Sequence, residues 1–358
     1  MNSLIAASNS GLLQNNYLFI LTILTVSLLG LLLGSFGVVV VVRKETLISE
    51  SLVHATLPGV VLTFMILRKK NIFLLLLGSA LSCLLMIYIF RFIKKYTKLK
   101  KTTILAVLLS GFFGFGQVLV SILDKKGINE RASVEEVIFG QVAYISKIDL
   151  YTILVSSVLI FILFALFWKE IKLYTFDKAL YISLGFNPIL AEIFITATLV
   201  TCVVLGIQSI GIVLLTIMLI APTFIARQFS DKFSLNFIIS GVTGLFSGII
   251  GITISHFVKN FPPSSAVVII LSGLAVLSLV FSPKRGLAVV GIKQVRYKKQ
   301  INKYHYLIHL YTSSDKYELN QDMKTYLIHK QYISQDGKIT ELGIKKAKNL
   351  FEGRQFWI

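Results

Sequence analysis

Hydrophobic residues occur along the first 283 positions in long runs, each bounded by charged or turn-forming residues. An α-helix needs about 20 apolar residues to cross the hydrocarbon core of a bilayer. The apolar block 190–227 is too long for one crossing, so we divide it at Gln208 and Ser209. The pattern predicts an all-α polytopic membrane protein. Nine spans are expected, at 17–42, 47–67, 72–93, 103–123, 149–168, 188–207, 209–229, 235–257 and 264–282.

The hydrophobic pattern changes at about residue 284. We expect residues 1–283 to form a transmembrane domain and residues 284–358 to form a basic cytoplasmic tail, which holds 15 basic and 6 acidic residues. Helix-like and strand-like patterns flank Asp336 and Gly337, a pair typical of hairpin turns. The tail is therefore predicted to be a small α/β unit that resembles part of a winged-helix module.

The composition excludes a soluble domain, because hydrophobic residues make up 55% of the chain and charged residues only 15%. The formal net charge is +19, and the basic residues gather at span ends and in the tail. Basic cytoplasmic loops are usual in membrane proteins, so this charge does not call for a nucleic-acid partner. Cys83 and Cys202 lie in apolar runs and indicate neither a disulfide framework nor a thiolate metal site.

Lysine and arginine also predict the orientation in the membrane. The densest basic run of the membrane region is at 91–101, and we place it in the cytoplasm. With nine spans, the N-terminus is then outside and the C-terminus is cytoplasmic. The basic residues at 68–70 fall outside and depart from the rule. The outer loop 124–148 is either a solvated loop or contains a short surface helix at 133–145.

Charged side chains inside membrane spans are expensive and indicate a functional site. The stretch "LISESLVHATLPG" places Glu50 and His54 four residues apart, on one face of a helix. A carboxylate and an imidazole suit a divalent first-row metal ion such as Mn²⁺, Fe²⁺ or Zn²⁺. Pro58 cannot donate a hydrogen bond to the His54 carbonyl, and a carbonyl freed in this way is tolerated beside a wet cavity. Gly59 lets the kinked backbone approach a neighbouring helix. Alternatively, Glu50 and His54 form a hydrogen-bonded pair that only holds two helices together.

One helix cannot supply a complete set of metal ligands. Further polar candidates inside or near the ends of other spans are Glu192, Gln208 and His256, and the sequence does not show whether they converge. The chain contains neither a G-x-x-x-x-G-K-[ST] phosphate-binding loop nor an H-E-x-x-H pair. We therefore expect no catalytic residues, no enzyme activity and no permanently bound cofactor.

Glycines at small-xxx-small spacing predict helix faces that pack closely. The two clear cases are Gly30 with Gly34, and Gly244 with Gly248. Close packing is the simpler interpretation, and sliding of these faces during gating is the alternative.

The chain resembles the membrane subunits of the bacterial manganese, zinc and iron ABC importers. That family carries a basic pair followed by a Gly-Asp-Ala-Leu-Ser-His-x-x-Leu-Pro-Gly-like motif. The matching residues here are Arg43, Lys44, Glu50, His54, Pro58 and Gly59. Further matches, in the family's order over residues 17–283, are Phe139, Gly140, Phe176, Asp177, Ala179, Gly185, Gly211, Leu214, Pro222, Ala226, Gly251, Ser255, Pro262 and Pro263. The resemblance implies that Glu50 and His54 are metal ligands, with glutamate standing where the family has aspartate.

The resemblance also implies partners. The segment 174–190 is similar to the cytoplasmic element that docks on the ATPase, with matches at Asp177, Ala179 and Gly185. In the same segment, Asn187 and Pro188 form a favourable helix start. The expected partners are a separate cytoplasmic ATPase, an extracytoplasmic metal-binding protein and a second permease chain, identical or related. The expected location is the bacterial cytoplasmic (inner) membrane.

The leading hypothesis is therefore the permease subunit of an ATP-binding-cassette importer for Mn²⁺, Zn²⁺ or Fe²⁺. Pro222 is expected to kink or pack its helix. The tail resembles the truncated winged-helix extension of longer family members. Two alternatives remain open. One is an ion-coupled secondary metal transporter, and the other is a membrane-tethered regulator that responds to metal and binds DNA through its tail.

Overall fold

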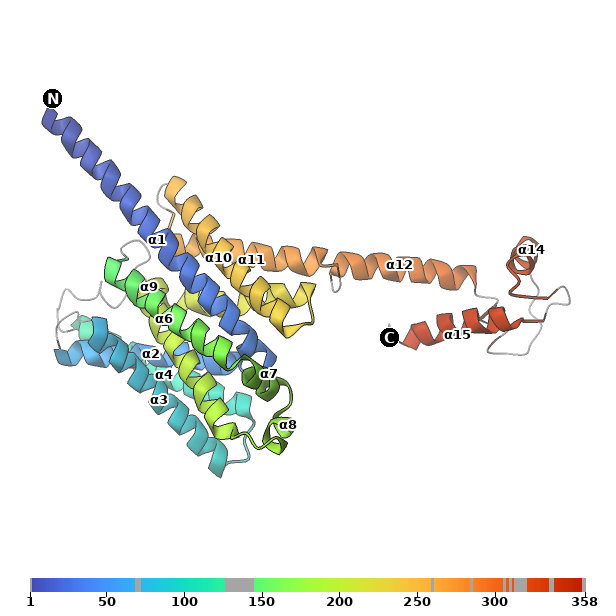
Figure 1. Cartoon of the computed structure of the whole chain (residues 1–358), viewed down its shortest axis with the longest axis horizontal. Helices are drawn as coiled ribbons and strands as arrows, with labels where there is room; N and C mark the ends of the chain where they lie inside the picture. The colour runs from blue at the N-terminus through green and yellow to red at the C-terminus, as the bar shows by residue number, and fades with distance from the viewer. Residues whose placement is uncertain are drawn as a thin grey trace. The chain divides into compact units, whose positions relative to one another are not determined.

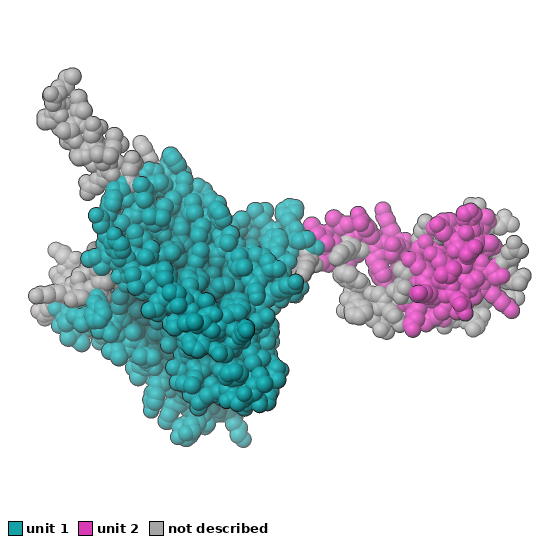
Figure 2. Space-filling model, in the orientation of Figure 1, with its two compact units in different colours: residues 1–284 teal, residues 285–358 magenta. Residues whose placement is uncertain are grey.

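The computed structural model of the chain describes two compact units, Met1–Lys284 and Arg285–Ile358, which are coloured separately in Figure 2. The described residues are 2–67, 72–125, 145–258, 261–283, 286–304, 307–308, 311, 321–334 and 338–355.

The first unit is built from α-helices (Figure 1). Their bounds are α1 Asn2–Val42, α2 Thr46–Leu67, α3 Ile72–Tyr96, α4 Lys101–Lys125, α6 Lys147–Leu166, α7 Trp168–Phe176, α8 Lys178–Ser183, α9 Pro188–Phe229, α10 Phe233–Phe257 and α11 Pro263–Phe281. Within the described residues, nine segments are long and apolar enough to cross a membrane. They agree with the nine predicted spans to within a few residues at each end. The prediction of an all-α polytopic membrane protein is thus confirmed. The alternative surface helix at 133–145 lies, except for its last residue, outside the described residues.

Two of the nine spans belong to one long helix with a break. Helix α9 runs for 42 residues, and Gly211 inside it has φ 76° and ψ 171°. A positive φ of this size is easily reached only by glycine. The backbone therefore breaks at Gly211, three residues beyond Gln208 where the sequence analysis divided the apolar block. Pro222 lies within the second half of α9 and is buried.

Helix α1 packs along α9 and α10 at the centre of the unit. A Cβ atom on Gly30 would collide with the Gly244 carbonyl, and one on Gly34 would collide with the Ser240 carbonyl. Gly248 likewise faces the backbone of Ser27. The predicted close packing at these glycines is confirmed, because only hydrogen atoms fit between the two backbones.

The second unit contains α12 (Leu287–Lys303), α14 (Gln321–His329) and α15 (Glu341–Gln355). Its core is formed by Leu307, Leu327, Ile333 and Ala347. Ile333 and Ile339 form an isolated antiparallel bridge, and no strand occurs among the described residues of this unit. The expected α/β winged-helix fold is therefore not shown, and the predicted turn at Asp336 and Gly337 lies outside the described residues.

Candidate functional site

The first candidate site is the pair Glu50 and His54 in the first half of α2. Both side chains are partly buried and lie one helical turn apart, close enough for the Glu50 charge to act on the imidazole. The His54 ring makes an edge contact with Phe113 of α4, with 5.0 Å between ring centroids. Its Nδ1 atom is buried and has no hydrogen-bond partner. A buried nitrogen without a partner is costly, so it is poised to accept a ligand.

Neighbouring helix α3 holds the backbone of α2 around this pair. The Ser82 hydroxyl donates to the carbonyl of Ala55 at 2.6 Å, and the Cys83 thiol contacts the carbonyl of Leu52 at 3.5 Å. At the next turn, a Cβ atom on Gly59 would collide with the Gly78 carbonyl. Pro58 has no N–H to donate to the His54 carbonyl, so one backbone hydrogen bond of α2 is missing here. The contacts from α3 support α2 at this position.

The pair supplies two ligand types suited to a divalent first-row metal ion, a carboxylate oxygen and an imidazole nitrogen. Within the described residues, no group of three or more His, Cys, Asp or Glu side chains is close enough to hold a metal. Glu50 and His54 alone would therefore fall short of the four to six ligands that such an ion prefers.

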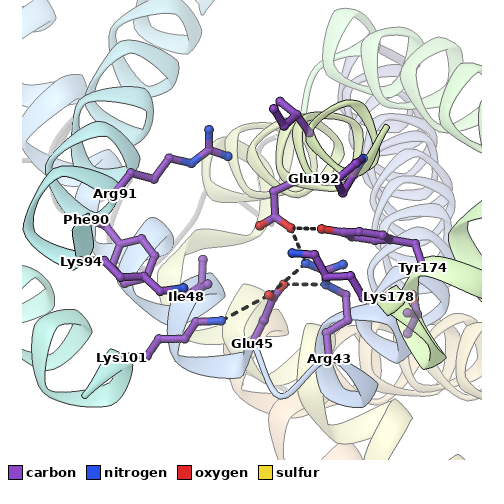
Figure 3. A pocket seen from close by; sticks show the side chains of 13 residues that line it. Arg43, Glu45, Ile48, Phe90, Arg91, Lys94, Lys101, Tyr174, Lys178 and Glu192 are labelled. Carbon is purple, nitrogen blue, oxygen red and sulfur yellow. Dashed lines mark hydrogen bonds and ion pairs between the residues drawn. The ribbon is translucent and has the colours of Figure 1, made fainter. Parts of the chain in front are cut away.

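Glu192, another candidate ligand, takes part in a different cluster at the end of the bundle (Figure 3). Arg43 Nη2 lies 2.9 Å from Glu192 Oε2, and the Tyr174 hydroxyl donates to the same oxygen at 2.7 Å. Arg43 also makes a two-pronged contact with Glu45, at 2.9 and 3.1 Å, and Lys101 Nζ lies 3.2 Å from Glu45 Oε1. We call these five residues the Arg43 network. The Glu192 carboxylate is thus already satisfied by this network.

Electrostatics keep the two hydrogen-bond donors to Glu192, Arg43 and Tyr174, protonated at neutral pH. Burial alone would lower the pKa of Arg43, but hydrogen bonds and charges from Glu45 and Glu192 outweigh it and raise the pKa above its ordinary value. Burial, followed by the hydrogen bond to Glu192, raises the pKa of Tyr174 to about 12. Both groups therefore remain protonated donors, and the Arg43 guanidinium lies 4.9 Å from the centre of the Tyr174 ring.

His256, a further candidate from the sequence, does not join Glu50 and His54. His256, in the last turn of α10, packs on Phe19 with 4.3 Å between ring centroids. Since α1 is one unbroken helix, Phe19 lies about 35 Å along its axis from the residue that precedes Arg43. His256 and Glu192 are thus at opposite ends of the bundle. Gln208 lies in α9, and its side chain is outside the described part of the structure.

The segment expected to dock on an ATPase forms two short helices, α7 and α8. Asp177 ends α7 and caps α8, where its carboxylate accepts a hydrogen bond from the Leu180 N–H at 2.9 Å. Ala179 is exposed on α8, and Gly185 ends the segment with φ 85°. Asn187 then caps α9 by accepting from the Ile189 N–H at 2.9 Å, as expected for an Asn-Pro helix start.

Sequence reasoning overlooked the Arg43 network. It considered Arg43 only as one of a basic pair, and Glu192 only as a possible ligand. A local signal did exist for Glu45, because an acidic residue two positions after Arg43 at a span boundary can pair with it. No local signal connects Arg43 with Glu192 or Tyr174.

Several proteins of related sequence are membrane components of metal transport systems. The manganese transport system membrane protein MntC of Bacillus subtilis is 31% identical over 292 residues, which cover 82% of this chain and 67% of MntC. The zinc transport system membrane protein TroC of Treponema pallidum is 34% identical over 258 residues, 72% of this chain and 87% of TroC. A probable iron transport system membrane protein of Haemophilus influenzae is 28% identical over 250 residues, 70% of this chain and 85% of the relative.

The fold is shared with a solved structure, PsaBC from Streptococcus pneumoniae in complex with a Fab. The TM-score is 0.66 at 22% sequence identity, and the match covers 74% of this chain and 91% of that chain. The sequence model of the ABC 3 transport family matches residues 15–282, a range that includes all nine candidate membrane spans of the described residues. This chain therefore belongs to the ABC 3 transport family.

Proposed function

We propose that this chain is the permease subunit of an ATP-binding-cassette importer that carries a divalent transition metal ion, Mn²⁺, Zn²⁺ or Fe²⁺, across the bacterial cytoplasmic membrane. Membership of the ABC 3 transport family supports the transporter class. The names of its relatives, which specify manganese, zinc and iron transport, support the class of substrate.

Glu50 and His54 are the metal ligands in this proposal. The observation that carries it is the buried Nδ1 of His54, which has no hydrogen-bond partner and lies one turn from a membrane-embedded carboxylate. A hydrogen bond to Glu50 would occupy only one ring nitrogen of His54, so such a pair by itself gives the other nitrogen no partner. Glu192 and His256 are engaged elsewhere, by Arg43 and by Phe19.

A second permease chain, identical or related, would complete the pathway and contribute further ligands. The need for it follows from the coordination chemistry, because two side chains fall short of the four to six ligands that these ions prefer. Water and the carbonyl left without its helical donor by Pro58 are the other sources.

The proposed orientation of the chain in the membrane follows from the positions of its basic residues. Arg43, Arg91, Lys94, Lys101 and Lys178 all line one cavity, so they lie at the same end of the bundle. This end is cytoplasmic by the positive-inside rule, which puts the N-terminus outside and the tail at 284–358 inside.

The proposed orientation also sets the partners. Helices α7 and α8 then face the cytoplasm, where exposed Leu180, Ile182 and Leu184 offer an apolar surface to a separate ATPase subunit. ATP hydrolysis belongs to that subunit, and an extracytoplasmic binding protein delivers the metal to the opposite end.

The proposal is tested by uptake of radiolabelled Mn²⁺, with Zn²⁺ and Fe²⁺ as competitors, in cells that express the chain with its ATPase. Glu50→Gln and His54→Ala should each reduce uptake at least about tenfold, since losing even an outer partner of a metal site costs that much. Glu341→Gln and His256→Ala make the same chemical changes away from the site and should transport normally.

All variants are compared at equal abundance in the membrane. Normal uptake by Glu50→Gln and His54→Ala would reject the ligand assignment. Uptake that persists after removal of the ATPase would reject the importer class and favour an ion-coupled carrier.

A further inference from the structure

A cavity of about 520 Å³ lies beside the Arg43 network, between α2, α3, α4, α7, α8 and α9. This volume is within the range of small-ligand pockets, about 300–1,000 Å³. Figure 3 shows Arg91 and Lys94 of α3 on one side of the cavity and Tyr174 and Lys178 on the other. The metal-transport role proposed above makes no use of this cavity.

Positive charge is in excess in the cavity. Five basic and two acidic side chains line it, and both carboxylates are already bound, Glu45 by Arg43 and Lys101, and Glu192 by Arg43 and Tyr174. In the described part of the chain, Arg91, Lys94 and Lys178 form no ion pair with a carboxylate. The lining therefore carries three more positive than negative charges, and only Lys178 of these three cations also interacts with the Glu192 charge.

A hydroxyl group in the wall has also been left without a partner. Thr175 Oγ1 is buried, makes no hydrogen bond, and belongs to a residue that lines the cavity. A buried hydroxyl without a partner costs free energy, which a bound oxygen acceptor would recover. The positive-inside rule explains the lysines and arginines but not this hydroxyl.

The cavity lies where lipid headgroups are found. Arg43 follows the last residue of α1, Lys101 begins α4, and Pro188 begins α9, so the lining residues come from the ends of membrane spans. Apolar side chains, Ile48, Phe90 and Ile189, also line it. A cationic wall next to an apolar one fits a molecule with a phosphate at one end and hydrocarbon at the other. The same cations would repel a divalent metal ion, which argues against a metal exit.

We propose that this cavity binds the phosphate headgroup of an anionic phospholipid. Basic pockets between transmembrane helices on the cytoplasmic side are suited to such headgroups. Arg91, Lys94 and Lys178 neutralise the phosphate oxygens, and the Thr175 hydroxyl donates to one of them. The excess of three positive charges in the lining favours diphosphatidylglycerol, with two phosphates, over lipids with one. The assignment to the cytoplasmic leaflet rests on the orientation proposed above, whereas the binding site itself does not depend on the transported metal.

Native mass spectrometry of the purified full-length chain, titrated with diphosphatidylglycerol or phosphatidylethanolamine, tests the proposal. The double variant Arg91→Gln with Lys94→Gln should weaken diphosphatidylglycerol binding roughly 30-fold, at about fivefold for each basic residue. The control, Lys98→Gln with Lys100→Gln, removes the same charge from the exposed α3–α4 loop outside the cavity and should change binding less than about threefold. Equal losses in the two double variants, or equal binding of both lipids, would overturn the site.

Two further arms separate the alternatives. Thr175→Val changes no charge and should weaken diphosphatidylglycerol binding severalfold without lowering the thermal stability of the chain; unchanged binding would remove the hydroxyl from the site. Inorganic phosphate should compete only weakly, and saturable phosphate binding that is stronger than lipid binding would show a soluble anion to be the occupant. Glu50→Gln should bind lipid normally, so failure of the metal site and failure of the lipid site are distinguishable.

Discussion

Arg43 contacts Glu192 across 149 positions of the sequence, with 2.9 Å between Nη2 and Oε2. The same guanidinium holds Glu45 in a two-pronged contact. One side chain therefore joins the end of α1, the start of α2 and the first turns of α9. Tyr174 on α7 donates to the same Glu192 oxygen. The helix that carries Glu50 and His54 is thus connected, through Arg43, to the segment that we propose docks on the ATPase.

Replacing Arg43 should destabilise the folded chain. Arg43→Gln leaves Glu45 and Glu192 without their shared partner, and the Arg43 side chain is only 10% exposed. A polar group deprived of its partner costs about 1–3 kcal/mol, so the midpoint of thermal unfolding in detergent should fall by roughly 3–8 °C. Arg43→Lys should be intermediate, because an ammonium group cannot reproduce the two-pronged contact.

The matched control is Lys44→Gln, which removes an exposed positive charge from the adjacent position. It should shift stability by less than about 0.5 kcal/mol. If Lys44→Gln and Arg43→Gln lowered the unfolding midpoint equally, stability would depend on the net charge between α1 and α2 and not on the contacts of the Arg43 network.

The hydrogen bond from Tyr174 should give a distinctive pH dependence. The pKa of Tyr174 is raised to about 12 in the folded chain, above its ordinary value of about 10. The protonated phenol is thus the form that the fold favours. Its contribution to stability is complete below about pH 10 and is lost as pH rises through about 12.

Comparison of the wild type with Tyr174→Phe measures this contribution. The difference between their unfolding midpoints should be constant from about pH 7 to about pH 9 and should shrink above about pH 10. A difference that changed between pH 6 and pH 8 would mean that another group titrates in place of the Tyr174 phenol.

Close packing of α1 on α10 should make Gly244 intolerant of any side chain. A Cβ atom there would collide with the Gly30 carbonyl, which belongs to a helix backbone that cannot move alone. Gly244→Ala should therefore cost about 1–3 kcal/mol and reduce the yield of folded chain in mild detergent. Gly114→Ala is the control, since no atom lies within 4 Å of a Cβ at that position of α4. It should be neutral or slightly stabilising, because alanine favours a helix over glycine by about 0.5–1 kcal/mol.

The cap at Asp177 should be needed for docking of the ATPase. Helix α8 has six residues, too few to be stable alone, and Asp177→Ala removes a cap worth about 1 kcal/mol. Less ATPase should then co-purify with the chain. Asp177→Asn loses the same charge but keeps an oxygen that can accept from the Leu180 N–H, so it should retain the ATPase. Equal losses in both variants would indicate that the charge of Asp177 matters and the cap does not.

Local patterns in the sequence were enough to predict the spans, the helix start at Asn187 and Pro188, and the shared helix face of Glu50 and His54. Each of these depends on neighbours within a few positions or on the requirement that a backbone in lipid bond to itself. The small residues at Gly30 and Gly244 marked two faces for close packing without revealing that they pack on each other.

Only the tertiary structure decided which distant residues meet. Glu192 and His256 were equivalent candidates in the sequence, yet one binds Arg43 and the other packs on Phe19 at the far end of the bundle. The break in α9 falls at Gly211 and not at Gln208. Hydropathy could not locate it, because the residues on both sides are apolar and hydropathy does not report backbone dihedral angles. Membrane-spanning helices form from local hydrogen bonds and burial in lipid, whereas partners such as Arg43 and Glu192 are chosen by how the finished helices pack.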